Sequence, residues 1–340
     1  MIDLGVGRKI STIVISTALG HDGRGIFPYT TQRDYGDMVR AANLSDTTRI
    51  SKSFTRDKRR GNFRPFRPWT WKYIQNLGED GMLNAYDLTN RGAEVHCRQI
   101  AETMSLGIPV IPSFFPEFGK GVGPATKDVL ETIAMIGRNE YSRREGGFWA
   151  IELNFSYPNT PECVADNVEA AVQCVKGVKR HYPDIAIIAK ISVVHPLEFA
   201  NRLREAGADI LHSANTVPYD LLFSDKSPLA KVGGGGVSGG PAFEFAFEYN
   251  SRVVDFFDGP VILGCGIVDD DKLNAYFEML QQKRPDKNWS LSVCTAALRR
   301  PEWVERKIHE HNLKLKRVCS TAEGAGDEAN FPSKRIRFAE

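Results

Sequence analysis

Short apolar runs alternate with longer amphipathic stretches along most of the chain. Each run is four to nine residues long and rich in Ile and Val, which is typical of strands covered on both faces. The eight runs lie at residues 12–17, 48–53, 108–115, 148–155, 185–193, 208–213, 260–263 and 289–294. Helix-like stretches follow at residues 33–42, 90–105, 125–136, 165–181, 196–206, 242–257, 269–282 and 301–311.

This order predicts eight consecutive strand–helix units. Strands separated by helices run parallel, because each crossover returns the chain to the same end of the sheet. Eight units within about 300 residues are the size and count of a (β/α)8 barrel, the TIM-barrel fold of the α/β class. A doubly wound open sheet is the alternative. We expect one barrel domain over residues 1–318 and a mobile tail over residues 319–340.

Composition and charge narrow the class of protein. The 340 residues are 42% hydrophobic and 25% charged, which excludes a disordered or fibrous chain. Lys and Arg number 44 against 42 Asp and Glu, so the net charge of +2 gives no field that would attract nucleic acid or an anionic membrane. No apolar stretch approaches the roughly 18–20 residues of a membrane span. The six cysteines show no CxxC pair and no zinc spacing, so we expect a reduced, cytoplasmic protein without a metal.

The longest connection without a helical pattern covers residues 56–80. Its basic residues are interleaved with aromatic ones, namely Arg56, Lys58, Arg59, Arg60, Arg64 and Arg67 with Phe63, Phe66, Trp69, Trp71 and Tyr73. Such a loop could bind single-stranded nucleic acid, cover an anionic ligand or form a subunit contact. Because the net charge is near zero, we expect no nucleic-acid partner.

Polar residues gather where the predicted strands end, which is where barrels of this kind carry their sites. Lys52 and Lys190 lie at two strand ends, and Asn154 and Asn215 at two others. The late connections are rich in glycine and small residues, at 233–240, 264–266 and 294–295. Converging backbone N–H groups in such turns bind phosphate. The lysines and amides would then face whatever group the phosphate anchors.

Several of these residues have more ordinary interpretations. Lys190 could be a Schiff-base lysine or the partner in a structural ion pair. His195 precedes a proline and is expected to cap a helix start, and His212 is expected to be a satisfied core residue. His21 follows the first predicted strand and could reach the site.

Three segments resemble motifs of the dihydroorotate dehydrogenase family. Ser51-Lys52-Ser53-Phe54-Thr55, followed by Arg-Arg-Gly61-Asn62, resembles the family's Thr-Lys-Ser-x-Thr and Arg-x-Gly-Asn. Asn154-Phe-Ser156-Tyr157-Pro158-Asn159 resembles its Asn-x-Ser-x-Pro-Asn signature, the most specific motif in the chain. Gly235-Gly-Val-Ser-Gly239 resembles its phosphate loop. The resemblance runs in order over residues 11–312 and implies an FMN-binding (β/α)8 barrel.

The resemblance also implies roles for the matched positions. Lys190 would neutralise the charge that a reduced flavin carries at its N1/O2 edge. The FMN-binding positions would be Ala18, Gly20, Lys52, Ser53, Asn154, Lys190, Gly235, Gly236, Ser238, Gly239, Gly264, Cys265, Gly266, Cys294 and Thr295. The substrate, gripped by its amides and carboxylate, would contact Lys52, Asn76, Asn154, Asn159, Asn215 and Thr216. Asn76 is placed by counting from Asn62 across a stretch that carries a short insertion.

The chain departs from the family at the catalytic position. The family's base lies between Ser and Pro of the signature and is Cys or Ser, whereas this chain has Tyr157. A phenol with a pKa near 10 is a poor base and a suitable acid at neutral pH, unless Lys52 lowers that pKa. The catalytic candidates are therefore Tyr157, Lys52 and Ser156, with the thiol of Cys163 as a substitute. Cys265 and Cys294 also replace family glycines and would crowd a phosphate unless they point inward.

The resemblance implies an oxidoreductase that interconverts a CH–CH compound and a conjugated C=C compound by hydride transfer at flavin N5. The small-molecule substrate would be dihydroorotate/orotate or a related planar amide or acid. Tyr157 favours ene-reduction over oxidation. The membrane-bound branch of the family carries an N-terminal helical extension, whereas the first predicted strand of this chain already begins at residue 12. We therefore expect no membrane contact and no quinone. The electron donor or acceptor is expected to be soluble, and the resemblance implies a homodimer. A lyase that uses Lys190 as nucleophile and a flavin-binding protein without turnover are the alternatives.

Overall fold

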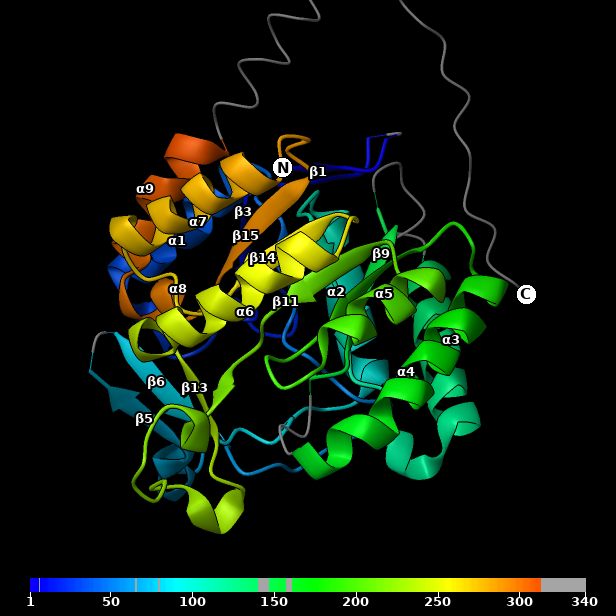
Figure 1. The fold of residues 1–340 in the computed structure, drawn as a ribbon, viewed down its shortest axis with the longest axis horizontal. Coiled ribbons are helices and arrows are strands. Elements are labelled where there is room, and N and C mark those ends of the chain that lie inside the picture. Colours follow the sequence, from blue (N-terminus) through cyan, green and yellow to red (C-terminus); the bar gives the residue numbers. More distant parts are fainter. Residues whose placement is uncertain (6, 65, 79, 140–146, 157–160, 313–340) are drawn as a thin grey trace, which may run out of the picture.

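Eight parallel strands form a closed barrel surrounded by helices (Figure 1). This computed structural model describes residues 1–5, 7–64, 66–78, 80–139, 147–156 and 161–312. The strand order is β7-β4-β3-β15-β14-β11-β10-β9-β8, and every pair is parallel. Only Pro112 separates β7 from β8, so these are two halves of one strand that pairs with β4 on one side and β9 on the other. The predicted (β/α)8 barrel is therefore confirmed, and the open sheet is excluded.

Most barrel strands are shorter than the apolar runs that predict them, whereas β14 has the same length as its run. They are β3 Ile13–Ser16, β4 Arg49–Ile50, β7 Val110–Ile111, β8 Ser113–Phe114, β9 Ala150–Asn154, β10 Ala186–Lys190, β11 Ile210–Ser213, β14 Val261–Gly264 and β15 Trp289–Val293. Eight helices lie close to their predicted positions: α1 Arg33–Leu44, α2 Ala93–Ser105, α3 Val122–Gly137, α4 Pro161–His181, α5 Leu197–Glu205, α6 Phe243–Phe256, α7 Asp270–Lys283 and α9 Pro301–His311. The short helix α8 Thr295–Arg299 was not predicted.

Strand periodicity divides the barrel interior into layers. Alternate residues of a strand point to the same face, so one set of each strand faces the barrel axis. The lower interior is apolar and includes Val14, Ile50, Ala150, Ile188 and Ile262. Two residues further along the same strands, the inward positions become polar. The amino ends of the strands therefore hold the core, and their carboxyl ends carry the chemistry.

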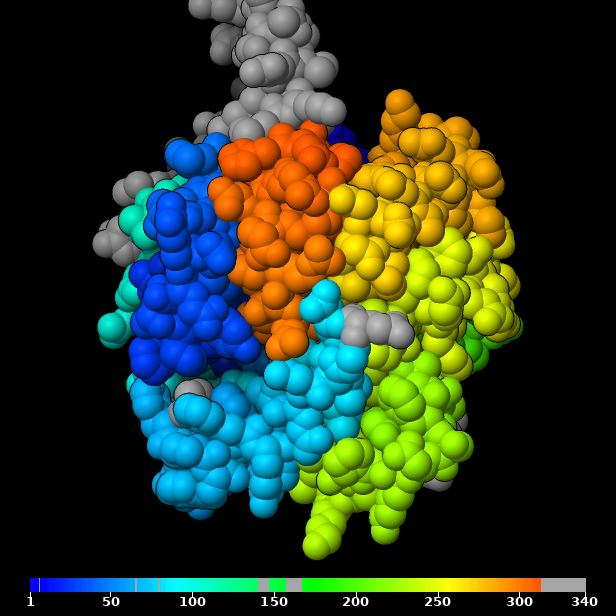
Figure 2. All heavy atoms as spheres, turned by 90° about the vertical axis from the view of Figure 1, so that its left-hand side faces the viewer, coloured from blue at the N-terminus to red at the C-terminus, as the bar shows by residue number. Residues whose placement is uncertain are grey.

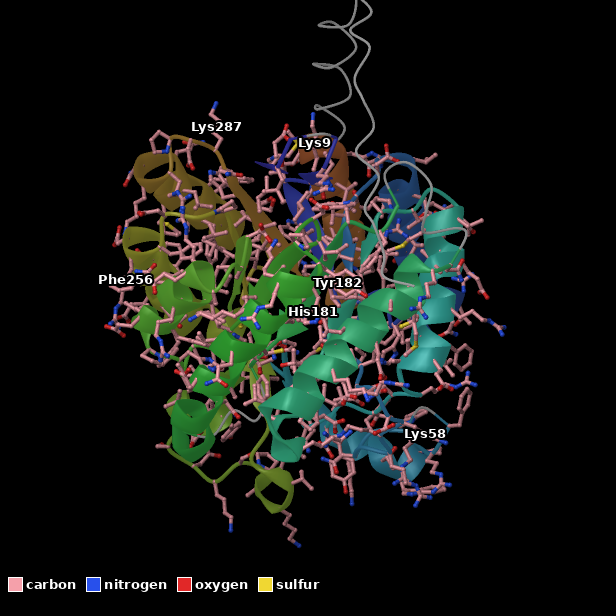
Figure 3. All side chains as sticks on the ribbon, turned by 90° about the vertical axis from the view of Figure 1, so that its right-hand side faces the viewer. Lys9, Lys58, His181, Tyr182, Phe256 and Lys287 are labelled. Atoms are coloured by element: carbon pink, nitrogen blue, oxygen red, sulfur yellow. The ribbon has the colours of Figure 1, made fainter. Side chains whose placement is uncertain are left out.

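An N-terminal hairpin closes the apolar end of the barrel. Its strands are β1 Ile2–Asp3 and β2 Lys9–Ile10, and the fully buried Ile2 and Ile10 pack into the interior cluster. Figure 3 shows Lys9 and Lys287 at this end of the molecule and Lys58 at the opposite end. In the ranges that the structure describes, no helix has the length and apolarity needed to cross a membrane.

A small antiparallel sheet covers part of the opposite, polar end. It contains β5 Ile74–Leu77 and β6 Gly81–Asn84 from the connection after the second strand, and β12 Val217–Pro218 and β13 Gly236–Ser238 from the connection after the sixth. Residues 56–80 are thus not an open loop as expected, because they contain the 3-10 helix Pro68–Tyr73 and β5. Figure 2 shows the two segments, in cyan and yellow-green, side by side below the barrel helices, in agreement with the pairing of β6 and β13.

Removing the apolar plug should weaken the barrel. Ile10→Ala deletes a fully buried side chain from the interior cluster, and such truncations lower the free energy of unfolding by about 2–5 kcal/mol. Urea unfolding followed by circular dichroism measures the change. Leu44→Ala is the control, since Leu44 is 73% exposed at the end of α1 and should shift the free energy by no more than about 0.5 kcal/mol. Equal effects of the two substitutions would show that the hairpin is not part of the core.

Candidate active site

A cavity of about 1170 Å³ opens between the carboxyl ends of the barrel strands and the small sheet. Its size exceeds the roughly 300–1,000 Å³ of a pocket for one small molecule, so it has room for a cofactor and a substrate together. Most residues singled out from the sequence line it: Lys52, Ser53, Asn76, Asn154, Lys190, Asn215, Thr216, Gly235, Gly236, Ser238, Gly239, Cys265, Gly266, Cys294 and Thr295. The fold thus brings together residues from six strand ends.

Two lysines provide positive charge in the floor of this cavity. Lys190 ends β10 and is buried, and Lys52 follows β4. The Nζ atom of Lys52 lies 3.4 Å from the ring centroid of Tyr86, a cation–π contact. Burial, together with repulsion from Lys190, lowers the pKa of Lys52 to about 8, with Cys294 opposing the shift. Lys52 can therefore exchange a proton near neutral pH, unlike an ordinary lysine.

The amide side chains form a hydrogen-bonded group that begins beside Lys190, since Asn154 is the partner of Lys190 in the ladder between β9 and β10. Asn154, at the end of β9, donates from Nδ2 to the Oγ atom of Ser53 at 2.9 Å. Its Oδ1 atom accepts from the backbone N–H of Ser156 at 3.1 Å and from the Ser156 hydroxyl at 2.5 Å. Asn215 donates from Nδ2 to Ser156 Oγ at 2.8 Å. Asn154 and Asn215 are therefore held by the protein before any ligand binds.

The late strand ends form the small-residue side of the cavity. The Thr295 hydroxyl donates to Ser238 Oγ at 2.8 Å, so the eighth strand end meets the glycine-rich segment. A Cβ at Gly236 would lie 2.2 Å from Thr216 Oγ1, and one at Gly266 would lie 2.5 Å from the Cα of Phe243. These two glycines allow the segments to approach closely. The Sγ atom of Cys294 lies 3.1 Å from Thr17 Oγ1, so this side chain points inward.

Some residues singled out from the sequence lie behind the cavity wall. Ala18 is buried and its carbonyl accepts the Tyr35 hydroxyl, and the Gly20 carbonyl accepts the Lys52 N–H. Gly264 leaves space for Ser292, because a Cβ there would lie 2.2 Å from Ser292 Oγ. Ser156 is buried and reaches the cavity only through Asn154 and Asn215. Tyr157 and Asn159 lie outside the described residues, and so do the side-chain contacts of Cys163.

Sequence reasoning missed several lining residues, among them Asn84, Tyr86 and Phe27. Phe63 and Trp71 also line the cavity, and they belong to the basic, aromatic connection for which covering an anionic ligand was one of the expected uses. Asn84 Nδ2 donates to the Gly236 carbonyl at 3.3 Å, whereas Asn76 is exposed on β5. The stretch with the short insertion contains a second asparagine, Asn84, and this could have pointed to it as an alternative to Asn76. Tyr86 carried no signal, because the sequence does not show that it stacks on Lys52.

The three histidines also have definite places. His21 stacks on His96 with ring centroids 4.1 Å apart and does not line the cavity. His195 does not cap α5 as expected, because the N-cap is Pro196 and no side chain bonds to the first turn; its Nδ1 instead accepts the backbone N–H of Ser192, in the segment before the helix. His212 is buried with both ring nitrogens hydrogen bonded, as predicted, although its ring also lines the cavity floor.

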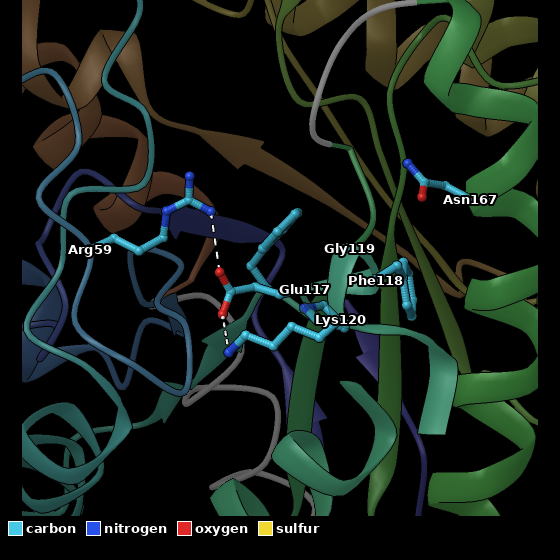
Figure 4. A pocket seen from close by; sticks show the side chains of 8 residues that line it. Arg59, Glu117, Phe118, Gly119, Lys120 and Asn167 are labelled. Atoms are coloured by element: carbon cyan, nitrogen blue, oxygen red, sulfur yellow. Dashed lines mark hydrogen bonds and ion pairs between the residues drawn. The ribbon is translucent and has the colours of Figure 1, made fainter. Parts of the chain in front are cut away.

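A second, smaller cavity of about 260 Å³ lies between the segment at residues 115–120 and α4 (Figure 4). Its charged groups pair with one another: Glu117 contacts Arg59 at 3.4 Å and Lys120 at 3.1 Å. Because these charges are already compensated, this cavity has less reason to attract an ionic ligand than the large one.

A barrel with a large cavity at the carboxyl ends of its strands, lined by both apolar and polar side chains, is the architecture of barrel enzymes. Residues 35–273 match the dihydroorotate dehydrogenase family, and because this match covers more than half of the chain, the protein belongs to that family of oxidoreductases. No curated protein matches the chain. Among solved structures, the Amycolatopsis orientalis BexX/CysO complex is similar over 97% of this chain and 98% of that chain, with 13% identity and a TM-score of 0.43. That similarity is too low to inform function.

The unusual acidity of Lys52 can be measured directly. In protein labelled with ¹³C at the lysine ε-carbons, the Lys52 signal should titrate near pH 8, and Lys52→Met identifies it by its loss. Lys190→Met should move this titration to higher pH, because it removes a positive charge that lowers the Lys52 pKa. A Lys52 signal that titrates near 10.4, the ordinary value for lysine, would contradict this account.

Proposed function

We propose that the protein is an FMN-dependent oxidoreductase that interconverts a CH–CH compound and a conjugated C=C compound. The substrate would be dihydroorotate/orotate or a related planar amide or acid. One observation carries the proposal: Lys52, Lys190, Asn154 and Asn215 line a single cavity in a barrel of the dihydroorotate dehydrogenase family. Cationic groups suit a carboxylate, and fixed amides suit the amide edges of a flat ring.

The described residues fit FMN. The cavity has two chemically different regions. Lysines lie in its floor, and glycines, Ser238 and Thr295 line the side formed by the last strands of the barrel. The second region has hydroxyl groups and little side-chain bulk, which suits a phosphate. Lys190 would face the ring system and Thr295 and Ser238 the phosphate. Cys294 does not stand against this arrangement, because its thiol turns toward Thr17.

When bound, FMN would supply the hydride exchange that the side chains of a protein cannot perform. The residues of this chain would bind and orient the substrate and manage its proton. Lys190 would keep a positive charge beside the cofactor. Asn154 and Asn215, already hydrogen bonded to Ser156, would hold the substrate at little further cost in side-chain entropy. Lys52 would pair with the substrate carboxylate.

Tyr157 is the proposed acid/base. Its phenol would protonate the carbon next to the one that receives the hydride, since an ordinary tyrosine is protonated at neutral pH. The reverse reaction, oxidation of the dihydro compound, would require the phenolate. Lys52 and Ser156 would assist, and Cys163 is the substitute if a thiol performs the step. We therefore propose ene-reduction as the favoured direction.

The electron partner would be a soluble donor or acceptor, and the protein would act as a homodimer. The family match favours this oxidoreductase over a lyase that uses Lys190 as a nucleophile. Borohydride trapping of a substrate on Lys190 would reverse that preference. A flavin-binding protein without turnover is the outcome if no compound reduces or reoxidises the bound flavin.

The first test is the visible spectrum of the purified protein, followed by anaerobic addition of dihydroorotate. We expect a yellow protein with flavin bands that survive gel filtration. Bleaching by dihydroorotate would identify the substrate and show that the oxidative direction operates. A yellow protein that does not bleach, but is reoxidised by orotate or a related ene-compound after chemical reduction, would support ene-reduction. A colourless protein that takes up no FMN would contradict the proposal.

Tyr157→Phe tests the proton-transfer role. Loss of a general acid or base lowers turnover by roughly 10²- to 10⁴-fold, while flavin binding should persist. Rapid-reaction measurement of flavin reoxidation separates the two effects. Tyr86→Phe is the matched control, because it retains an aromatic ring under Lys52 and removes only a phenol hydroxyl. Turnover of Tyr157→Phe equal to that of the Tyr86→Phe control would exclude the role.

Binding of a carboxylate ligand should depend on pH through Lys52. Below pH 8 Lys52 is protonated and attracts the carboxylate, and above pH 8 it becomes neutral, so affinity should fall as the pH rises. Loss of one charged hydrogen bond corresponds to roughly tenfold or more in the dissociation constant. Orotate titrated against the flavin spectrum between pH 6 and pH 10 measures it. Lys52→Met should bind weakly at every pH; a pH step that persists in this variant would assign the titration to another group.

A further inference from the structure

A buried carboxylate lies directly behind the wall of the large cavity. Glu152, on β9, has no exposed surface and does not line the cavity, but its neighbour two positions along the strand, Asn154, does. Three polar residues of the barrel interior surround it: Ser113 on β8, His212 on β11 and Ser292 on β15. The family motif does not include Glu152, and the function proposed above gives it no role.

Each oxygen of this carboxylate has its own partner. The Oε1 atom accepts from the Ser113 hydroxyl at 2.6 Å. The Oε2 atom lies 2.5 Å from Nδ1 of His212, whose Nε2 lies 3.0 Å from Ser292 Oγ. Glu152 therefore joins two hydrogen-bond arms, one through Ser113 and one through His212.

The surrounding charges favour an ionised glutamate and a neutral histidine. Burial alone would raise the pKa of Glu152, but the positive charge of Lys190 and the bonds from His212 and Ser113 outweigh it and hold the pKa below its usual value. Burial and Lys190 lower the pKa of His212, against the opposing effect of Glu152. A neutral His212 facing a carboxylate must carry its proton on Nδ1, so its Nε2 accepts from Ser292.

An ionised carboxylate can only accept hydrogen bonds, and this fixes which group donates at each step of the arm through Ser113. Ser113 must donate its single proton to Glu152, so in the 2.8 Å contact between the two serines Ser53 must donate to Ser113. Ser53 Oγ can then only accept from Asn154, which turns the Asn154 amide nitrogen toward Ser53 and its carbonyl oxygen toward Ser156. The backbone N–H of Ser156 requires the same orientation from the other end.

We propose that Glu152 is a positioning residue of the active site. It acts through Ser113 and Ser53 on the orientation of the Asn154 amide, and through His212 on the pattern of donors and acceptors in the cavity floor. This inference rests on the proposed function, because Asn154 would contact the cofactor and the substrate. A neutral glutamine could either donate or accept, so it would leave the direction of both arms undetermined.

Ser113→Ala tests the arm toward Asn154. The substitution cuts the link between Glu152 and Ser53 but leaves the Glu152–His212 contact in place. The net value of one hydrogen bond is about 0.5–1.5 kcal/mol, so the dissociation constant of FMN should rise roughly three- to tenfold. Titration of the flavin-free protein with FMN, followed by quenching of flavin fluorescence, measures it.

Ser290→Ala is the matched control. Ser290 is a buried serine on β15, two residues before Ser292, and its hydroxyl has no partner among the described residues. This variant should bind FMN within about twofold of the unchanged protein, since it removes a hydroxyl that takes no part in either arm. Equal FMN affinities for Ser113→Ala and Ser290→Ala would overturn the proposed action on Asn154.

The arm through His212 is tested by the tautomer of its ring, which can be measured without any ligand. In ¹⁵N-histidine-labelled protein, the His212 signal, identified by its loss in His212→Gln, should show a proton on Nδ1. A glutamine at position 152 can either donate to Nδ1 or accept from it, so Glu152→Gln should populate the form with the proton on Nε2 as well. A proton on Nε2 in the unchanged protein would overturn the proposed role of Glu152.

The two experiments separate this inference from the proposed function. If the unchanged protein takes up no FMN, the proposed function fails, and the tautomer alone supports or overturns the role of Glu152. If FMN binds and the Ser113→Ala affinity is unchanged, the positioning role fails and the proposed function stands.

Discussion

Closure of the parallel sheet is the constraint on which the rest of the structure depends. Once β7 and β8 join the ring through Pro112, every second side chain of eight strands faces one narrow interior. That interior has no access to bulk water except at its carboxyl end. Apolar residues fill the lower part, and any charged group higher up must find a partner or meet the cavity. The positions of Glu152, Lys190 and Asn154 follow from this requirement.

The charged residues of the barrel interior lie at different levels along the strands. Glu152 lies below, fully enclosed and hydrogen bonded, and Lys190 lies two residues further along a neighbouring strand, where Asn154 is its partner in the ladder. Lys52 also lines the cavity floor, where it contacts the ring of Tyr86, two residues after β6 of the covering sheet. The buried negative charge thus offsets part of the positive charge that faces the cavity. This arrangement keeps a strongly cationic floor compatible with a folded barrel.

Much of the fold could be predicted from the sequence, because strands covered on both faces give unbroken apolar runs and the helices between them give a regular amphipathic pattern. The lysines and asparagines at the strand ends could be predicted for the same reason. The small sheet could not. Its strands β5 and β13 lack an apolar pattern, and the pairing of β13 with β6 joins residues far apart in the sequence, such as Gly236 with Asn84. For that reason the sequence predicts a loop where the structure has the strand Gly236–Ser238, and it does not predict that Tyr86 lines the cavity. Glu152 lies within a run that predicts only a buried strand, and the sequence predicts that His212 is a satisfied core residue but not that Glu152 is its partner.

The small sheet has a consequence for how this protein can diverge from its relatives. Its four strands come from two connections that are separated by more than a hundred residues, yet they share one ladder over the cavity. An insertion or deletion in either connection would shift the register of the other, so the two segments must change together. Exchange of a single loop between homologues would therefore damage the cover, whereas helices on the outside of the barrel could be replaced one at a time. If the two segments are to stay matched, recombination within the gene preserves the sheet only when its breakpoints lie outside residues 74–238.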